Sequence, residues 1–220
     1  MQEYTFGNQS FQAYETIPKS GQGTGILVCH AWWGLTDVFI NVCNRLAAEG
    51  FVTLAPDIFH GETAETIKEA QSLRSKINRS QAKKEVRAAL DYLQSHPAVV
   101  GDYLGAIGFS YGCSYAIEAA RLRPKVVKAV ALFYGTGGGK LDQTQAIFQG
   151  HFAEKDEWGA NPMKAKKLEE RIQSAGQEAE FYIYPGVTHW FFEENNEAYN
   201  QEAAELAWER SVAFMRDHLA

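Results

Sequence analysis

Short apolar runs recur along the chain, and longer stretches of mixed polarity separate them. Such runs, bounded by Gly or Pro, are typical of strands that are buried on both faces of a parallel sheet. They occupy residues 25–29 (GILVC), 51–56 (FVTLAP), 103–109 (YLGAIGF), 126–134 (VVKAVALFY), 146–152 (AIFQGHF) and 179–185 (AEFYIYP). Ahead of them, residues 3–17 alternate polar and apolar positions around the turn sequence GNQS, which predicts an N-terminal β-hairpin.

The stretches between these runs carry apolar residues at helical spacing. Val38, Phe39, Val42 and Leu46 fall on one face of a helix that we predict over residues 36–49. Further helices are predicted over residues 64–95 (two helices), 111–123, 162–175 and 197–219. Strands and helices alternate regularly, which predicts an α/β fold: an open, doubly wound, mostly parallel sheet with helices on both faces. In such sheets, ligands bind outside the carboxyl ends of the strands.

The composition is typical of a globular protein, because 45% of the 220 residues are hydrophobic and 22% are charged. This length predicts one domain spanning residues 1–220. The net charge of −6 disfavours nucleic acid and anionic membranes as partners, since both select basic faces. No apolar run reaches membrane-spanning length, and the first residues lack the pattern of a signal peptide.

The cysteine and histidine patterns bear on location and cofactors. Cys29, Cys43 and Cys113 are odd in number and lack the spacing of a disulfide framework, which favours a reducing, cytoplasmic location. The histidines show no recognised metal-ligand spacing, so we expect neither a metal nor an organic cofactor. We expect a monomer or a small homo-oligomer whose partner is a small molecule.

One serine lies between a predicted strand and a predicted helix, in the sequence Gly108-Phe109-Ser110-Tyr111-Gly112. This G-x-S-x-G pattern is that of a nucleophile elbow, a strained turn whose flanking glycines let strand and helix approach closely. The alternative is a plain strand-to-helix turn with a solvent-facing serine, because five-residue patterns also occur by chance. Cys113, which follows in the helix, is expected to be a small packed residue.

A serine nucleophile needs a general base. Only His189 and His218 follow Ser110 and an intervening acid, which is the chain order that this architecture uses. His218 lies at the end of the last predicted helix, whereas His189, in YPGVTHWFF, follows the last predicted strand on the same rim as Ser110. His189 is therefore the predicted base, and a surface imidazole is the alternative.

The base needs a carboxylate that fixes its tautomer and stabilises its cation. Glu154, Asp156 and Glu157 all lie in HFAEKDEW, at the carboxyl end of a predicted strand. Asp142 precedes that strand and falls on the opposite rim. Position alone does not separate the first three acids, which also fit an ordinary charged loop.

Acyl transfer also needs two hydrogen-bond donors for the tetrahedral oxyanion. The candidates are the backbone N–H groups of Tyr111, directly after the serine, and of Trp32, in the loop HAWWGLT. Aromatic residues in the rim loops suit an apolar substrate pocket, although each also fits core packing. These residues are Trp32, Trp33, Phe59, Tyr134, Trp158 and Trp190. Residues 60–80 follow a rim loop and fit either a lid over this pocket or an ordinary surface helix.

In combination, these motifs resemble the dienelactone hydrolase family of the α/β-hydrolase superfamily. The matching segments run in the family's order from about residue 25 to residue 192: HAWWGLTDVFINVCNRLAAEGFVTLAPDIFHG, GAIGFSYGC, AVALFYG, GHFAEKD and YPGVTHWFF. The resemblance implies an α/β-hydrolase fold with Ser110 as nucleophile, Asp156 as triad acid and His189 as base. It also implies oxyanion donors at Trp32 and Tyr111.

Two departures from the family pattern bear on the substrate. The best-known members carry a cysteine at the position of Ser110 and a glutamate at the position of Ala31, where it interacts with the resting thiol. The paired changes fit an ordinary Ser-His-Asp esterase. Those members also carry an arginine, which pairs with a substrate carboxylate, at the position of Glu193. If Glu193 reaches the pocket, it repels an anionic lactone, so the family name does not define the substrate.

The expected activity is hydrolysis of a carboxylic ester or lactone through an acyl-enzyme on Ser110, with His189 and Asp156 completing the triad. A thioesterase or acyl transferase that uses the same triad is one alternative. A non-catalytic binding protein that keeps the fold is another.

Overall fold

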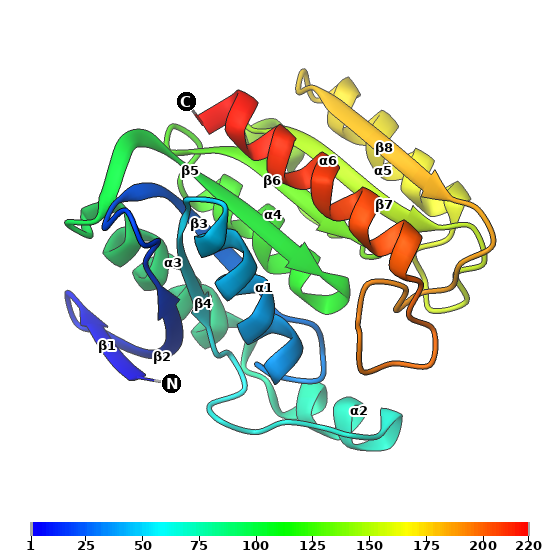
Figure 1. Ribbon diagram of the computed structural model, residues 1–220, viewed down its shortest axis with the longest axis horizontal. Helices are drawn as coiled ribbons and strands as arrows, with labels where there is room; N and C mark the ends of the chain where they lie inside the picture. The colour runs from blue at the N-terminus through cyan, green and yellow to red at the C-terminus, as the bar shows by residue number, and fades with distance from the viewer. Residues whose placement is uncertain (1, 220) are drawn as a thin grey trace.

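The computed structural model describes residues 2–219 and contains an eight-stranded sheet (Figure 1). The strands are β1 (Gln2–Phe6), β2 (Gln9–Thr16), β3 (Gly23–Cys29), β4 (Val52–Pro56), β5 (Val99–Phe109), β6 (Val127–Phe133), β7 (Ile147–Ala153) and β8 (Ala179–Tyr184). Their order across the sheet is β1-β2-β4-β3-β5-β6-β7-β8. The β1–β2 hairpin joins β4 in antiparallel fashion, and the strands from β4 to β8 are parallel to one another. The predicted mostly parallel sheet with an N-terminal hairpin is confirmed.

Helices cover both faces of this sheet. They are α1 (Asp37–Ala48), α2 (Ile67–Lys76), α3 (Arg79–Ser95), α4 (Cys113–Leu122), α5 (Pro162–Ser174) and α6 (Gln201–Leu219), with short 3₁₀ turns at η1 (Ser110–Gly112) and η2 (Leu141–Gln143). Helices α1 and α6 pack on one face, and α3, α4 and α5 pack on the other, while α2 lies beyond the ends of the strands (Figure 1). No helix within residues 2–219 combines the length and apolarity needed to cross a bilayer.

The two-faced burial explains why the strands are apolar at nearly every position. In β3, Leu27 packs into the core under α3 and α4, whereas Ile26 and Val28 pack into the core under α1 and α6. Successive side chains of a strand point to opposite faces, so a strand covered on both faces has no polar alternation.

The helix boundaries follow local capping. The predicted helical stretch 64–95 divides at Asn78, whose Oδ1 accepts the N–H groups of Ser80 and Gln81 and so starts α3. The last helix begins at Gln201, not at residue 197, because Asn200 Oδ1 accepts the N–H of Ala203 and residues 192–200 form turns. Capping side chains, more than hydrophobic periodicity, therefore place these boundaries.

The strand order creates a crevice at the carboxyl ends of β3 and β5. The chain moves from β3 to β4 on one side and then crosses to β5 on the other side of β3. Connections that leave neighbouring strands in opposite directions open a ligand-binding crevice between them. The loop after β3 holds Trp32, and the turn after β5 holds Ser110.

Candidate active site

The turn after β5 has the geometry of a nucleophile elbow. Ser110 has a φ of +49°, a left-handed conformation that a non-glycine residue adopts only under constraint. A Cβ on Gly108 would lie 2.7 Å from Cys113 Cα, and a Cβ on Gly112 would overlap the carbonyl oxygen of Cys29. The two glycines therefore let the strand, the turn and the end of β3 pack against one another.

Three side chains from separate loops converge at this elbow. The hydroxyl Oγ of Ser110 lies 2.8 Å from Nε2 of His189, which follows β8. Nδ1 of His189 lies 2.6 Å from Oδ2 of Asp156, which follows β7. In the neutral imidazole, Nδ1–H donates to the carboxylate and Nε2 accepts from the serine hydroxyl. This is the order of contacts that activates a serine.

The carboxylate of Asp156 is held on both oxygens. Oδ1 accepts the main-chain N–H of Trp158 at 2.7 Å and that of Ala160 at 3.2 Å, while Oδ2 faces His189. Burial alone raises the pKa of Asp156, but the hydrogen bonds from His189 and the two N–H groups outweigh burial and leave this pKa below its ordinary value. The group is therefore an anion that orients the imidazole.

The neighbouring acids point elsewhere. Glu154 accepts the N–H of Gly186 at the surface, and Glu157 is exposed. Asp142 lies in η2, ahead of β7, and His218 packs against Phe214 near the end of α6. Of the acids and histidines that the sequence left open, only Asp156 and His189 lie at Ser110.

The candidate oxyanion donors flank the serine. Tyr111 begins the turn that leads into α4, and Trp32 lies in the loop after β3, against which Gly112 packs. Within residues 2–219, the main-chain N–H of Trp32 donates to no main-chain acceptor. Trp32, Ser110 and Tyr111 all line one cavity. Trp32 and Tyr111 therefore lie at the same cavity as Ser110.

This cavity has a volume of about 680 Å³ and contains Ser110 and His189 in its wall. Its apolar side is formed by the predicted aromatic residues Trp32, Tyr134, Trp158 and Trp190. The indole of Trp158 lies 5.6 Å from that of Trp32 and 4.9 Å from that of Trp190, so the three rings form one continuous aromatic wall. Trp158 remains 44% exposed, which places it at the mouth.

Two aromatic residues predicted for the pocket, Trp33 and Phe59, are not among the residues that line the cavity. Trp33 packs against the rings of Trp32 and Trp190, and Phe59 is buried between His30 and Tyr111. A contact of Trp33 or Phe59 with substrate stays a prediction. Sequence position placed both residues in rim loops, but it does not specify whether a side chain turns inward or outward.

Glu193 and Ala31 are both buried outside the cavity lining. Only 1% of Glu193 is exposed, and its Oε1 accepts a hydrogen bond from the Tyr134 hydroxyl at 3.0 Å. Burial raises the pKa of Glu193 to about 8, so the carboxyl group is mostly protonated at neutral pH. Glu193 therefore does not place a negative charge in the pocket, and it does not repel an anionic substrate. Ala31 is fully buried in the core under α1 and α6.

Cys113 is a packed core residue, as predicted. Its side chain is fully buried, and Sγ lies 3.1 Å from the carbonyl oxygen of Gly108. Burial raises the pKa of the Cys113 thiol far above its usual range, so no thiolate forms near neutral pH. Cys113 therefore offers no nucleophile beside Ser110.

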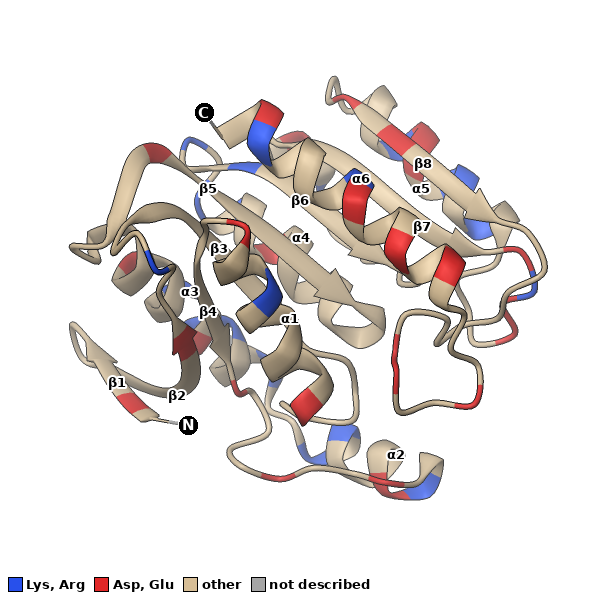
Figure 2. Cartoon of the chain, viewed as in Figure 1, with Lys and Arg blue, Asp and Glu red and all other residues tan. Residues whose placement is uncertain are grey.

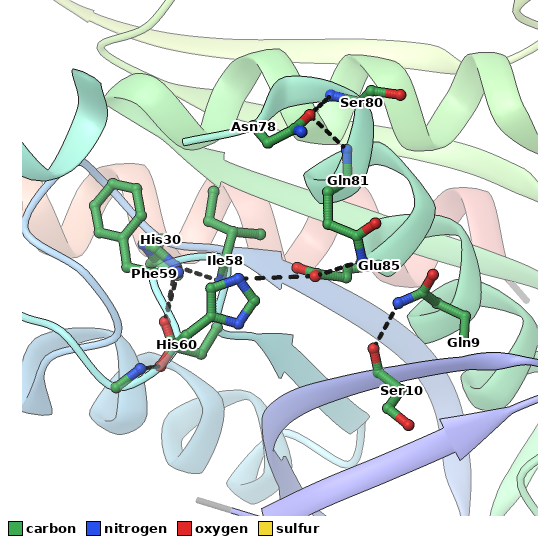
Figure 3. A network of polar contacts seen from close by, with 12 residues as sticks. Gln9, Ser10, His30, Ile58, Phe59, His60, Asn78, Ser80, Gln81 and Glu85 are labelled. Carbon is green, nitrogen blue, oxygen red and sulfur yellow. Dashed lines mark hydrogen bonds and ion pairs between the residues drawn. The ribbon is translucent and has the colours of Figure 1, made fainter. Parts of the chain in front are cut away.

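A polar network that includes the buried His30 and Glu85 joins the loop after β4 to α3, and sequence reasoning did not identify it (Figure 3). Nε2 of His30 accepts the N–H of Ile58, while His60 Nε2 lies 3.7 Å from Oε1 of the buried Glu85. Gln81 donates to the same Glu85 oxygen at 3.0 Å. The contact between His60 and Glu85 joins the start of the 60–80 segment to α3.

Basic side chains form a second wall of the cavity, which sequence reasoning also missed. They are Arg74, Arg79, Lys83 and Arg121. Arg74 and Arg79 belong to the 60–80 segment that was a candidate lid, and this segment does contribute to the cavity. Within residues 2–219, no group of three or more His, Cys, Asp or Glu residues is placed to hold a metal ion.

A mostly parallel sheet with helices on both faces and a serine at the elbow after β5 defines an α/β hydrolase. The sequence model of the dienelactone hydrolase family matches residues 11–219, and the chain belongs to that family.

Relatives and solved structures agree with this assignment. The chain is 30% identical to "Protein usf" of Aquifex pyrophilus over 229 residues, which cover 100% of this chain and 98% of the relative. It is 31% identical to the "Probable 2-oxo-3-(5-oxofuran-2-ylidene)propanoate lactonase" of a Bradyrhizobium species, covering 96% of this chain and 91% of the relative. The structure of a putative dienelactone hydrolase from Klebsiella pneumoniae superposes with a TM-score of 0.83 at 23% identity, covering 96% of this chain and 94% of that one.

Proposed function

We propose that the protein is a serine hydrolase that cleaves a carboxylic ester or lactone, with Ser110 as nucleophile, His189 as base and Asp156 as the orienting acid. The observation that carries the proposal is the chain of two short contacts, 2.8 Å from Ser110 to His189 and 2.6 Å from His189 to Asp156. Family membership and the lactonase name of one relative support the same reaction class.

In the first half of the reaction, Ser110 Oγ attacks the carbonyl carbon while His189 Nε2 takes the hydroxyl proton. The N–H groups of Trp32 and Tyr111 stabilise the oxyanion of the tetrahedral intermediate. The acyl C–O bond then breaks, and His189 gives its proton to the departing alkoxide. The products of this half are an alcohol and an acyl-enzyme on Ser110.

In the second half, water replaces the alcohol. His189 takes a proton from the water, whose oxygen attacks the acyl carbon, and the proton then returns to Ser110 Oγ as the carboxylic acid leaves. Asp156 keeps Nδ1 of His189 protonated throughout, so that Nε2 is free to accept a proton in both halves. The aromatic wall of Trp158 and Trp190 contacts the apolar part of the substrate.

A fluorophosphonate probe tests this proposal directly, because it phosphonylates only an activated serine. We expect wild-type protein to gain one adduct by intact-mass spectrometry, and Ser110→Ala to gain none. Ser114→Ala is the matched control: it removes another cavity hydroxyl, but one that already donates to the carbonyl of Tyr111 at 2.9 Å. Wild-type protein that resists labelling would contradict a catalytic role and favour a binding protein. A Ser110→Ala variant that still labels would contradict the assignment of Ser110 as nucleophile.

A further inference from the structure

The cavity lining contains two chemically different groups of side chains. One is the aromatic wall together with Ser110 and His189, and the other is the basic side chains of Arg74, Arg79, Lys83 and Arg121. The only carboxylate in the described lining is that of Glu118. A chain with a net charge of −6 therefore concentrates four cations against one anion along the cavity that contains its candidate catalytic serine. Figure 2 shows basic residues on α2, although both α2 and α6 carry charges of both signs.

These cations follow the length of α4. The guanidinium of Arg74 lies over the ring of Tyr111, the residue after Ser110, at 5.3 Å from the ring centroid. Lys83 Nζ lies 3.1 Å from Glu118, and Arg121 pairs with the same carboxylate. Residues spaced by three or four positions share a helix face, so the groove runs along one side of α4. At about 1.5 Å per residue, Arg121 lies about 16 Å from Ser110.

Two of the four cations have no carboxylate partner. Glu118 is shared between Lys83 and Arg121, whereas Arg74 and Arg79 form no ion pair with any carboxylate among residues 2–219. Unpaired like charges at one site repel each other, and a bound anion relieves that repulsion. The N-terminal end of α3 does not add free N–H donors for an anion, because Asn78 Oδ1 already accepts the N–H groups of Ser80 and Gln81 (Figure 3). The positive charge of this wall therefore comes from its side chains.

We propose that this basic wall binds the phosphate group of an elongated acyl ester or thioester whose carbonyl carbon lies at Ser110. The proposal rests on the hydrolase function proposed above. A phosphate monoester carries nearly two negative charges at pH 7, which matches the two unpaired guanidinium groups of Arg74 and Arg79. A planar guanidinium also binds phosphate oxygens in a bidentate manner. In the reaction, only the acyl C–O or C–S bond breaks; water supplies the oxygen of the acid, and the phosphate ester stays intact.

Competitive inhibition separates this inference from the proposed function. Hydrolysis of p-nitrophenyl butanoate, a neutral ester, reports the triad, and hexyl phosphate, hexanoate and hexanol are compared as inhibitors of equal chain length. We expect hexyl phosphate to have a Ki about tenfold below that of hexanol, with a difference that shrinks as salt is added. Equal values for hexyl phosphate and hexanol overturn the inference, and tighter binding of hexanoate overturns the assignment to phosphate. Absence of ester hydrolysis contradicts the proposed function instead.

Substitutions in the basic wall then test which side chains bind the phosphate group. In the double variant Arg74→Ala/Arg79→Ala, the preference for hexyl phosphate over hexanol falls to about twofold or less, whereas Arg79→Lys keeps part of it. The control is Lys84→Ala, which removes an exposed cation from the same helix as Lys83 but outside the cavity lining. It keeps the full preference. Far-UV circular dichroism confirms that each variant is folded. A double variant that retains the wild-type preference, or a control that loses it, overturns the assignment.

Discussion

Replacing Glu193 with glutamine tests what burial of this carboxyl group does to stability. Burial raises the pKa of Glu193 from an ordinary 4.5 to about 8, and the hydrogen bond from Tyr134 does not offset that effect. The folded state therefore holds this proton more tightly than the unfolded chain. Such a group stabilises the fold most fully below pH 4.5, and its contribution is lost as pH rises toward 8. Linkage gives a loss of about 4 kcal/mol between pH 5 and pH 9.

The stability of the variant Glu193→Gln does not decrease in this way as the pH rises. Its carboxamide oxygen can accept the hydrogen bond from the Tyr134 hydroxyl, but the carboxamide never becomes charged. We expect its free energy of unfolding, relative to that of wild type, to rise by up to about 4 kcal/mol from pH 5 to pH 9. Urea unfolding followed by circular dichroism measures both values at each pH.

The control for this experiment is Glu194→Gln, an exposed neighbour whose replacement changes the net charge by the same amount. Its free energy of unfolding should track that of wild type across the pH range. The reasoning is refuted if Glu193→Gln and wild type lose stability in parallel, or if the variant becomes relatively less stable as pH rises.

Three further outcomes are expected. Asp156→Asn lowers kcat on p-nitrophenyl butanoate by about 10³- to 10⁴-fold, because the imidazole of His189 loses the carboxylate that fixes its tautomer. Glu154→Gln keeps a kcat near that of wild type. Similar rates in both variants would contradict the assignment of Asp156 as the acid. Gly112→Ala lowers thermal stability by about 2 kcal/mol, because its Cβ overlaps a main-chain carbonyl, whereas Gly138→Ala, whose Cβ meets nothing within 4 Å, has little effect. Equal melting temperatures for these two variants would refute the steric argument for the elbow. Iodoacetamide leaves ester hydrolysis intact and modifies the three buried cysteines only after the protein unfolds. The reason is that burial raises the pKa of the Cys113 thiol and of the other two thiols. Rapid inactivation of native protein would argue for a thiol nucleophile.

The architecture could be predicted from the sequence because several patterns agree. Each apolar run became a strand, and the G-x-S-x-G sequence stands where the chain passes from β5 into α4. His189 could be selected by chain order and by its place after the last strand. These features depend on local sequence and on the general rule that strand ends share a rim.

The choice of acid and the direction of side chains could not be predicted in the same way. Asp156 shares one loop with two other acids, and it faces His189 because the N–H groups of Trp158 and Ala160 hold its other oxygen. That contact forms only when the loop folds. Likewise, Trp33 is not among the residues that line the cavity, whereas Trp158 is, although both are rim-loop residues.

The basic wall could not be predicted from the sequence for a different reason. Arg74 comes from α2, Arg79 from the start of α3 and Arg121 from α4, so no window of the sequence contains them together. In the sequence, each is one charge on an amphipathic helix, which is the ordinary pattern of a solvated face. Only the tertiary fold places the three around one cavity.

The aromatic wall also gives the protein a built-in optical reporter. Of the five tryptophans, Trp32, Trp33, Trp158 and Trp190 form one contiguous cluster at the cavity, with neighbouring ring centroids 4.9 to 5.6 Å apart. The fifth, Trp208, lies on α6 under the guanidinium of Arg45. Indole emission responds to local polarity and to nearby quenchers, so four of the five tryptophans are placed to report on the surroundings of this cavity. Occupancy of the cavity can therefore be followed in the unlabelled protein.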